Sequence, residues 1–304
     1  MLSVKDLNAE IRRDAKGFAQ ACEAGYAARV YEAAMAIEKN SEEKPVVLLS
    51  GYSGSGKTTT AQMIEAVLDK SGHETHTLSM DNYYWRPKGM VLPVDERGDV
   101  DLESPLLLDR ELLKDHLRRI GRGLPVDMPV YDFEKQQRSD EIIPLRRKKG
   151  EIIILEGIHA LDPAVVGDTA EFAQTVFVCP QQVYEADGNE LPPAQLRLLR
   201  RILRDVRTRG YSPENTVRKM WSVSRGERLY IDPNRFRAHY AIDSTIPYEL
   251  ALYTGLLGDM LRGMNSAAAV EAGIGQILPL MEASEALPDE VIGRGALVRE
   301  FIGG

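Results

Sequence analysis

Short apolar runs alternate with longer amphipathic stretches along most of this chain. Runs of apolar, often β-branched residues predict buried strands at residues 45–50, 75–80, 151–155 and 175–179. The amphipathic stretches predict helices at residues 59–70, about 105–120 and 192–209. Because strands that alternate with helices build parallel sheets, we expect a three-layer α/β fold with a mostly parallel sheet.

The two ends of the chain lie outside this alternation and are predicted to be helical. An alanine-rich stretch precedes a polar run at residues 38–44, and helical patterns at about 248–264 and 266–284 follow Pro247. We therefore divide the chain into a helical N-terminal extension (1–44), an α/β domain (45–246) and a helical C-terminal extension (247–304). We expect both extensions to serve packing or the formation of a homo-oligomer.

A glycine-rich loop joins the first predicted strand of the α/β region to a helix. Residues 51–58 fit Gly-x-x-x-x-Gly-Lys-Ser/Thr, the phosphate-binding loop of nucleoside triphosphatases. Glycine lets backbone N–H groups approach phosphate oxygens, and the helix N-terminus adds a partial positive charge. In this geometry Lys57 reaches the β- and γ-phosphates, and the Thr58 hydroxyl binds Mg²⁺. The expected nucleotide-binding residues are Gly51, Ser53, Gly54, Ser55, Gly56, Lys57, Thr58 and Thr59.

Two acidic residues follow predicted strands. Glu156 closes the apolar run 151–155, and Asp81 follows the run 75–80. Ligands of parallel α/β folds gather at the carboxyl ends of strands, so Glu156 is predicted to hold Mg²⁺ directly or through water. A kinase also needs a carboxylate near the acceptor hydroxyl and the metal, and Asp81 suits this role. Without the phosphate loop, Asp81 would indicate only a turn.

The segment from residue 131 to residue 138 mixes aromatic, amide and guanidinium side chains. Tyr131, Phe133, Gln136 and Arg138 together suit a planar, polar ligand such as a nucleobase. A hairpin with ordinary cross-strand pairs is the alternative interpretation.

Arginine is concentrated in the predicted helix at 192–209. At three- and four-residue spacing several of these side chains project to one side, and Asp205 offsets only part of their charge. Cations at such short distances repel one another unless an anion binds to them. Phosphoryl transfer needs cations near the phosphates. A solvated basic face, or one that binds RNA, is the alternative. The arginines are Arg197, Arg200, Arg201, Arg204, Arg207 and Arg209.

The overall composition narrows the class of protein. The 304 residues have a net charge of −8, which argues against a general nucleic-acid binder. Cys22 and Cys179 lack the spacing of a metal site and suit reduced thiols of a cytosolic protein. No apolar stretch reaches the ~18 residues of a membrane helix, and the charged residues 5–13 argue against a signal peptide. We expect a cytoplasmic protein with neither a membrane nor a nucleic-acid partner.

The order of these motifs resembles that of a known family. The loop at 51–58, the Asp81 turn, residues 129–133 with Arg138, residues 155–158 and residues 201–210 follow the pattern of the uridine/cytidine kinase branch of the uridine kinase and phosphoribulokinase family. The resemblance covers roughly residues 45–245. It implies a P-loop NTPase fold, ATP and Mg²⁺ as cofactors, and transfer of the γ-phosphoryl group to the 5′-hydroxyl of a nucleoside.

The resemblance also implies roles for single residues. Asp81 would be the general base and would serve Mg²⁺ together with Thr58 and Glu156. Arg204 and Arg209 would act on the phosphates, as Lys57 does. Tyr84 and Tyr131 would line the base pocket, and Asp101 and Arg201 would bind the ribose hydroxyls. The full set of expected acceptor-binding residues is Tyr84, Asp101, Tyr131, Phe133, Gln136, Arg138 and Arg201.

Two residues depart from the family pattern and leave the acceptor open. Gln136 stands where nucleoside kinases of the family often have a histidine that contacts the base, and Tyr211 stands where another arginine is usual. A kinase for a sugar or a sugar phosphate such as ribulose 5-phosphate is therefore an alternative, although the aromatic residues near Tyr131 suit a base better. A regulatory or assembly module that hydrolyses ATP slowly is an alternative of another class, in which Asp81 and Asp101 would have no purpose.

Overall fold

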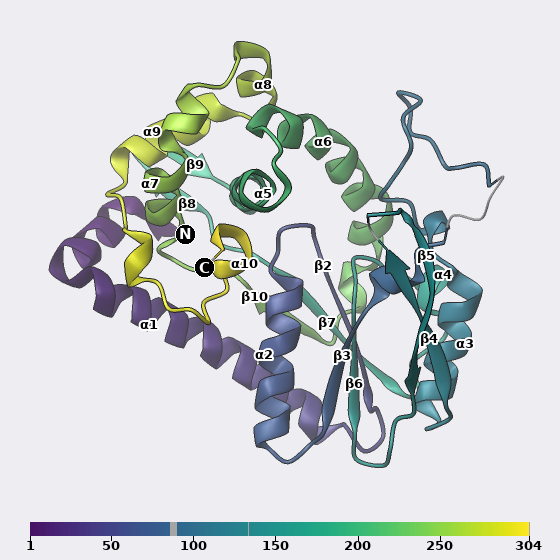
Figure 1. The fold of residues 1–304 in the computed structure, drawn as a ribbon. Coiled ribbons are helices and arrows are strands. Elements are labelled where there is room, and N and C mark those ends of the chain that lie inside the picture. Colours follow the sequence, from purple (N-terminus) through teal and green to yellow (C-terminus); the bar gives the residue numbers. More distant parts are fainter. Residues whose placement is uncertain (86–89, 133, 304) are drawn as a thin grey trace.

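A five-stranded parallel sheet forms the centre of the molecule. The computed structural model describes residues 1–85, 90–132 and 134–303, and Figure 1 shows its ribbon. The strand order is β10-β7-β2-β6-β3, and every neighbouring pair is parallel. Helices cover both faces of the sheet (Figure 1). The predicted three-layer α/β fold with a parallel sheet is confirmed.

The pairing of the strands places the carboxyl end of β2 in the middle of one edge of the sheet. All residues of β2 and β6 are buried, as expected for strands covered on both faces. The register pairs Glu156 with Leu49 on one side and with Ser79 on the other. The ends of these three strands therefore meet. The strands are β2 (Val46–Gly51), β3 (Thr75–Ser79), β6 (Ile152–Glu156), β7 (Ala173–Cys179) and β10 (Tyr240–Asp243).

Two hydrophobic cores flank the sheet. Val47 and Ile154 face the larger core, whereas Leu48 and Ile153 face the smaller one, as the alternation of side chains along a strand requires. The larger core contains residues of α1 (Val4–Lys39), α2 (Lys57–Lys70), α5 (Pro193–Arg209), α7 (Glu249–Arg262) and α9 (Ile274–Ala283). The smaller core contains residues of α3 (Arg110–Gly121) and α4 (Pro163–Val166).

Shorter elements surround this framework. A small sheet joins β1 (Leu2–Ser3), β8 (Tyr184–Ala186) and β9 (Asn189–Leu191), and β4 (Val126–Asp132) pairs with β5 (Gln137–Leu145) in an antiparallel hairpin. The remaining helices are α6 (Pro213–Gly226), α8 (Ser266–Glu271) and α10 (Arg299–Ile302). Short helical turns are η1 (Met80–Tyr83), η2 (Pro105–Leu107), η3 (Glu227–Ile231), η4 (Asp232–Arg237) and η5 (Asp289–Val291). Within the described ranges, every helix is too short or too polar to cross a membrane.

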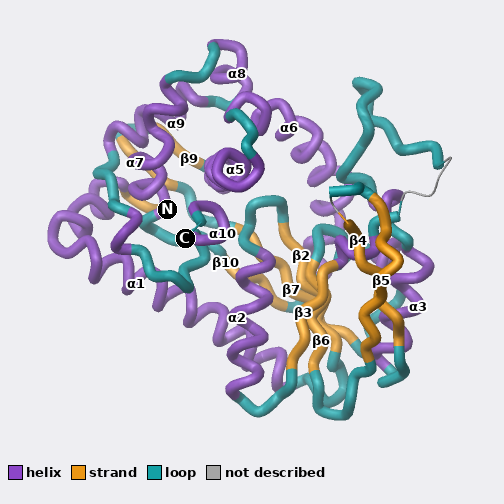
Figure 2. The backbone as a smooth tube through the Cα atoms, in the orientation of Figure 1, coloured by secondary structure: helices purple, strands orange, loops and turns teal. Residues whose placement is uncertain are grey.

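Both terminal extensions are helical, as predicted, and pack against the α/β region. Figure 2 shows α1 passing beside α2 and reaching the C-terminal helices. The side-chain amide of Gln174 in β7 donates to the carbonyl groups of Ile37 and Lys44, at 3.0 Å each, and so ties the end of α1 to the sheet. The division of the chain into domains at residues 44/45 and 246/247 stays a prediction.

Two predicted helices are interrupted in the structure. The prediction of a helix at 105–120 is wrong for its first residues, because Leu108 is extended. Helix α3 begins only after Asp109, whose carboxylate accepts a hydrogen bond from an N–H of the first turn. The helix predicted at 266–284 is split at Gly273, where φ is 67°. A right-handed helix ends at a left-handed residue, and glycine adopts this conformation without steric cost.

Arg200 of α5 and Glu249 of α7 form a fully buried ion pair. The guanidinium Nε and Nη2 lie 2.7 and 2.6 Å from the carboxylate oxygens, and neither side chain has exposed surface. The loss of one partner leaves a buried charge uncompensated, which costs about 3–5 kcal/mol. We predict that Glu249→Ala lowers the free energy of unfolding by this amount in urea titrations. The control Glu282→Ala, at an exposed position of α9, should change it by less than about 0.5 kcal/mol, and equal values for the two variants would contradict the prediction.

Candidate active site

The loop between β2 and α2 has a backbone that only glycine accommodates at its key positions. The φ angle is 76° at Gly54 and 84° at Gly56. A Cβ atom at Gly56 would lie 2.6 Å from Cδ1 of Leu297, and one at Gly51 would lie 2.1 Å from the carbonyl oxygen of Val178. Helix α2 begins directly after Gly56. The N–H groups of its first turn therefore face the loop, as anion binding requires.

The polar groups of this loop fit the phosphates of a nucleotide. Within the described chain, the buried hydroxyl of Ser55 has no hydrogen-bond partner. Burial lowers the pKa of Lys57, and the nearby carboxylates of Glu156 and Glu300 raise it. The Lys57 ammonium donates to the carbonyl of Tyr52 at 3.1 Å. A buried hydroxyl without a partner, a half-buried cation and a helix N-terminus together suit ATP.

Asp81 and Glu156 lie near Lys57 at the carboxyl edge of the sheet. Asp81 is in η1, directly after β3, and its N–H donates to the Ser79 hydroxyl at 3.3 Å. Burial raises the pKa of both carboxyl groups, and the charge of Lys57 lowers both. The charge of Asp81 also raises the pKa of Glu156, so the two carboxylates are neighbours. With the hydroxyl of Thr58 in the first turn of α2, these oxygen atoms fit Mg²⁺.

One arginine of α5 contacts the phosphate loop, and two more follow it on the same helix. Nη1 of Arg201 donates to the Ser53 hydroxyl, while its buried Nε has no partner within the described chain. Arg204 and Arg209 both donate to Asp205, at 3.3 and 3.1 Å. Burial and the neighbouring Arg209 lower the pKa of Arg204. A bound anion would relieve this repulsion between cations.

Arg197 and Arg200 do not belong to this group. The sequence predicted that the arginines of this helix would be available to bind an anion, and this prediction is wrong for these two. Arg197 donates to Glu227 at 2.5 and 2.9 Å, and Arg200 is paired with Glu249. Both guanidinium groups also support the loop, because they donate to the carbonyl groups of residues 53 and 54 at 3.1 Å. Spacing within α5 cannot reveal partners that lie so far along the chain.

The aromatic residues expected on the acceptor side lie together. The ring centroids of Tyr84 and Tyr131 are 5.6 Å apart. The N–H of Tyr131 donates to the side-chain oxygen of Asn82 at 3.2 Å, which joins the β4–β5 hairpin to the turn that contains Asp81. The two tyrosines therefore form one aromatic surface next to the turn that contains Asp81, and their role in a base pocket stays a prediction.

The hairpin also positions Arg138, whereas it leaves Gln136 on the surface. Nη1 of Arg138 donates to Asp109 at 3.0 Å, and its buried Nε and Nη2 have no partner among the described residues. Gln136 is exposed in the turn between β4 and β5, with a φ of 51°. Phe133 lies outside the described residues. Arg138 thus has two buried donors that a ligand can engage.

Two acids of one segment, Asp101 and Glu103, differ in their surroundings. Oδ2 of Asp101 accepts hydrogen bonds from Arg225 and from the Tyr230 hydroxyl, at 2.8 Å each. Burial raises the pKa of Glu103 to about 7, and the nearby Arg201 lowers it. The family resemblance named Asp101 for the ribose and did not name Glu103; the role of Asp101 stays a prediction.

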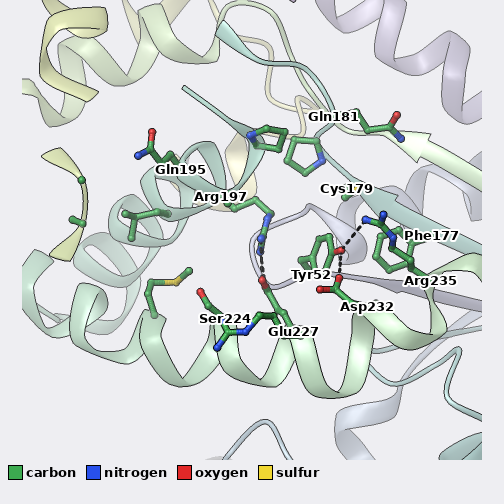
Figure 3. Close-up of a pocket in the computed structure, with 18 of the residues that line it drawn as sticks. Tyr52, Phe177, Cys179, Gln181, Gln195, Arg197, Ser224, Glu227, Asp232 and Arg235 are labelled. Atoms are coloured by element: carbon green, nitrogen blue, oxygen red, sulfur yellow. Dashed lines mark hydrogen bonds and ion pairs between the residues drawn. The ribbon is translucent and has the colours of Figure 1, made fainter. Parts of the chain in front are cut away.

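A cavity of about 950 Å³ lies on the outer side of the phosphate loop. Figure 3 shows that Tyr52 of the loop donates to Asp232 and lies beside Arg197. The Arg197 guanidinium carbon is 4.5 Å from the centroid of the Tyr52 ring, and the centroid of the Phe177 ring is 5.2 Å from it, with the two rings nearly perpendicular. Asp81 and the Tyr84–Tyr131 pair do not line this cavity. Its wall therefore supports the loop from behind rather than forming the acceptor side.

Known proteins resemble this chain over the α/β region. Residues 46–250 match the model of the Phosphoribulokinase / Uridine kinase family. A uridine kinase of Bacillus anthracis is 34% identical over 216 residues, which cover 67% of this chain and 92% of the relative. A uridine kinase of Staphylococcus aureus is 33% identical over 191 residues, or 62% of this chain and 83% of the relative.

A solved structure supports the fold. It is that of a candidate fructose transport system kinase from a Silicibacter species, with a TM-score of 0.53 and 17% identity over 70% of this chain and 98% of the other. At this identity the likeness concerns the fold alone. With the family match over two thirds of its length and with a phosphate loop of the expected geometry, the chain belongs to the phosphoribulokinase / uridine kinase family of P-loop kinases, which are nucleotide-binding phosphotransferases.

Proposed function

We propose that the protein transfers the γ-phosphoryl group of ATP to the 5′-hydroxyl of a ribonucleoside, uridine or cytidine. The observation that supports this most is the position of Asp81, a carboxylate near Lys57 and next to the wall of Tyr84 and Tyr131. In this proposal Asp81 would accept the hydroxyl proton, and the aromatic surface beside its turn would cover the base. The matched relatives from two bacterial species are uridine kinases.

Each part of the site has a role in this proposal. ATP would supply the phosphoryl group, and Mg²⁺ would offset the negative charge of its phosphates. Thr58 and Glu156 would hold the metal, and Lys57 would contact the β- and γ-phosphates. Arg204 and Arg209 would stabilise charge that develops on the transferred group. The hydroxyl proton would pass to Asp81 as the new bond to phosphorus forms.

A second acceptor class has one observation in its favour. The two buried donors of Arg138 that have no partner among the described residues suit the phosphate of a sugar phosphate as well as the carbonyl oxygen of a pyrimidine. The aromatic pair next to Asp81 favours the pyrimidine, because a sugar phosphate has no flat apolar face to cover it.

The surroundings of the two acids change which residue we expect to contact the ribose. Asp101 already accepts from Arg225 and Tyr230, so we propose that it positions the segment while Glu103 and Arg201 contact the sugar hydroxyls. A site built around a hydroxyl loses hydrogen bonds when the hydroxyl is absent.

We therefore predict that kcat/KM favours uridine over 2′-deoxyuridine by at least about tenfold. Glu103→Ala should erase most of this preference, because the variant cannot accept a hydrogen bond from the sugar. Steady-state kinetics on both nucleosides measures the ratio. Equal kcat/KM values for uridine and 2′-deoxyuridine in the unaltered protein would contradict the proposed ribose contact.

The acceptor is tested by a panel of nucleosides, sugars and sugar phosphates, with ATP consumption as the signal. The proposal expects consumption that depends on uridine or cytidine. Consumption that depends on a sugar phosphate would favour the second acceptor class. Slow consumption that no acceptor changes would instead favour a regulatory or assembly ATPase.

A further inference from the structure

A segment from outside the family region lies against the phosphate loop. The family match ends at residue 250, yet Leu297 is in contact range of Gly56 and the Glu300 side chain reaches Thr59. Figure 1 shows α10 between α5 and the start of α2, next to the loop that follows β2. The C-terminal extension is therefore adjacent to the site where the donor phosphates would bind.

The backbone of this segment is firmly held. Leu297, Val298, Phe301 and Ile302 are buried in the larger core. Arg207 of α5 donates to the carbonyl of Ile302, and the Arg200 guanidinium lies 5.2 Å from the Phe301 ring. Moving the segment would expose four apolar side chains to water, which opposes its release. It consequently forms a permanent wall of the site.

Glu300 places a negative charge of this wall beside the phosphate site. Its Oε2 accepts from the Thr59 hydroxyl at 2.7 Å. Burial lowers the pKa values of Lys57 and Arg204, two of the cations expected to meet the phosphates, and the charge of Glu300 opposes this shift. Burial raises the pKa of Glu156, and Glu300 adds to that shift. Glu300 thus joins the other carboxylates that surround Lys57. Three carboxylates, those of Asp81, Glu156 and Glu300, therefore surround Lys57 beside a site whose ligand is itself an anion.

We propose that Glu300 is a specificity-determining residue, which makes the phosphate site favour a metal-complexed donor over a free polyphosphate. The inference rests on the proposed use of ATP. A free polyphosphate is repelled by the carboxylates of Asp81, Glu156 and Glu300, whereas a divalent cation bound to it offsets that repulsion. The buried backbone of the segment and the hydrogen bond from Thr59 hold the carboxylate beside the site.

Calorimetric titration of the whole protein with ATP tests this, once with excess Mg²⁺ and once with EDTA. Glu300→Gln keeps an oxygen that can accept from Thr59 but removes the charge. We expect this variant to bind metal-free ATP about fivefold more tightly, and Mg²⁺–ATP at most about twofold more tightly. The control Glu290→Gln, at an exposed position of the same extension, should match the unaltered protein in both titrations.

Glu300→Lys reverses the charge and should strengthen the binding of metal-free ATP further. The dissociation constants for metal-free ATP and for Mg²⁺–ATP should therefore differ even less than in Glu300→Gln. A ratio unchanged in both Glu300 variants would overturn the inference, as would weaker binding of metal-free ATP to either. Failure of the unaltered protein to bind ATP under both conditions would instead contradict the proposed function. Melting temperatures of the variants show that any change in affinity comes from folded protein.

Discussion

Replacing Lys57 with alanine should abolish phosphoryl transfer and leave the protein folded. The ammonium lies next to Asp81 and Glu156, in the loop that would hold the β- and γ-phosphates. Loss of one such preorganised charge slows a reaction by at least about 100-fold. Burial lowers the pKa of Lys57, so the charge is unfavourably placed in the ligand-free protein. Its removal should leave the melting temperature unchanged or raise it.

The matched control is Lys70→Ala, at the exposed far end of the same helix. It should retain full kcat and full thermal stability. Single-turnover rates and a thermal melt of both variants make the comparison. A Lys57 variant with normal rates would show that the loop does not bind the reacting phosphates, and a collapse of its melting temperature would mean that Lys57 stabilises the fold instead.

Asp81→Asn should lower kcat by about 10²–10⁴-fold, which is far more than it weakens the binding of Mg²⁺–ATP. Asparagine has the same shape but cannot accept the proton of the acceptor hydroxyl. Asp115→Asn, an exposed acid on α3, should change neither quantity. If kcat with the true acceptor stays near that of the unaltered protein, Asp81 is not the base.

The same residue gives an expected pH dependence. Burial raises the pKa of Asp81, and the charge of Lys57 lowers it. The carboxylate must be ionised to accept a proton, so kcat should fall as the pH falls through the pKa of Asp81. The residual kcat of Asp81→Asn should lack this acidic limb. A profile with the same limb in both proteins would assign it to another group, such as Glu103.

The sheet and the phosphate loop could be predicted because their signals are local. Apolar runs such as 151–155 identify buried strands, and the glycines at 51, 54 and 56 together with Lys57 define the loop. Asp81 and Glu156 were predicted to lie at the site because the carboxyl ends of parallel strands meet at one edge of the sheet. The strands and the loop need no knowledge of residues far away in the sequence, whereas the roles of Asp81 and Glu156 were inferred together with the phosphate loop.

The rest depends on contacts between distant segments. Glu227 and Glu249 neutralise Arg197 and Arg200 from elements that come later in the chain, so the number of arginines in α5 overstated the free positive charge. Glu300 reaches Thr59 across most of the chain, and no local pattern marks it. The break before α3 arises because Leu108 pairs in a bridge with Tyr84, which the helical pattern around it does not show.

The most direct test of the proposed activity identifies the product that the protein makes from uridine, ATP and Mg²⁺. Phosphorus-31 NMR with proton coupling distinguishes an ester at the 5′-carbon, which bears two protons, from an ester at the 2′- or 3′-carbon, which bears one. We predict a phosphorus triplet from the 5′-monophosphate, formed in step with ADP. The appearance of ADP with inorganic phosphate alone, or of an ester at another hydroxyl, would contradict the account.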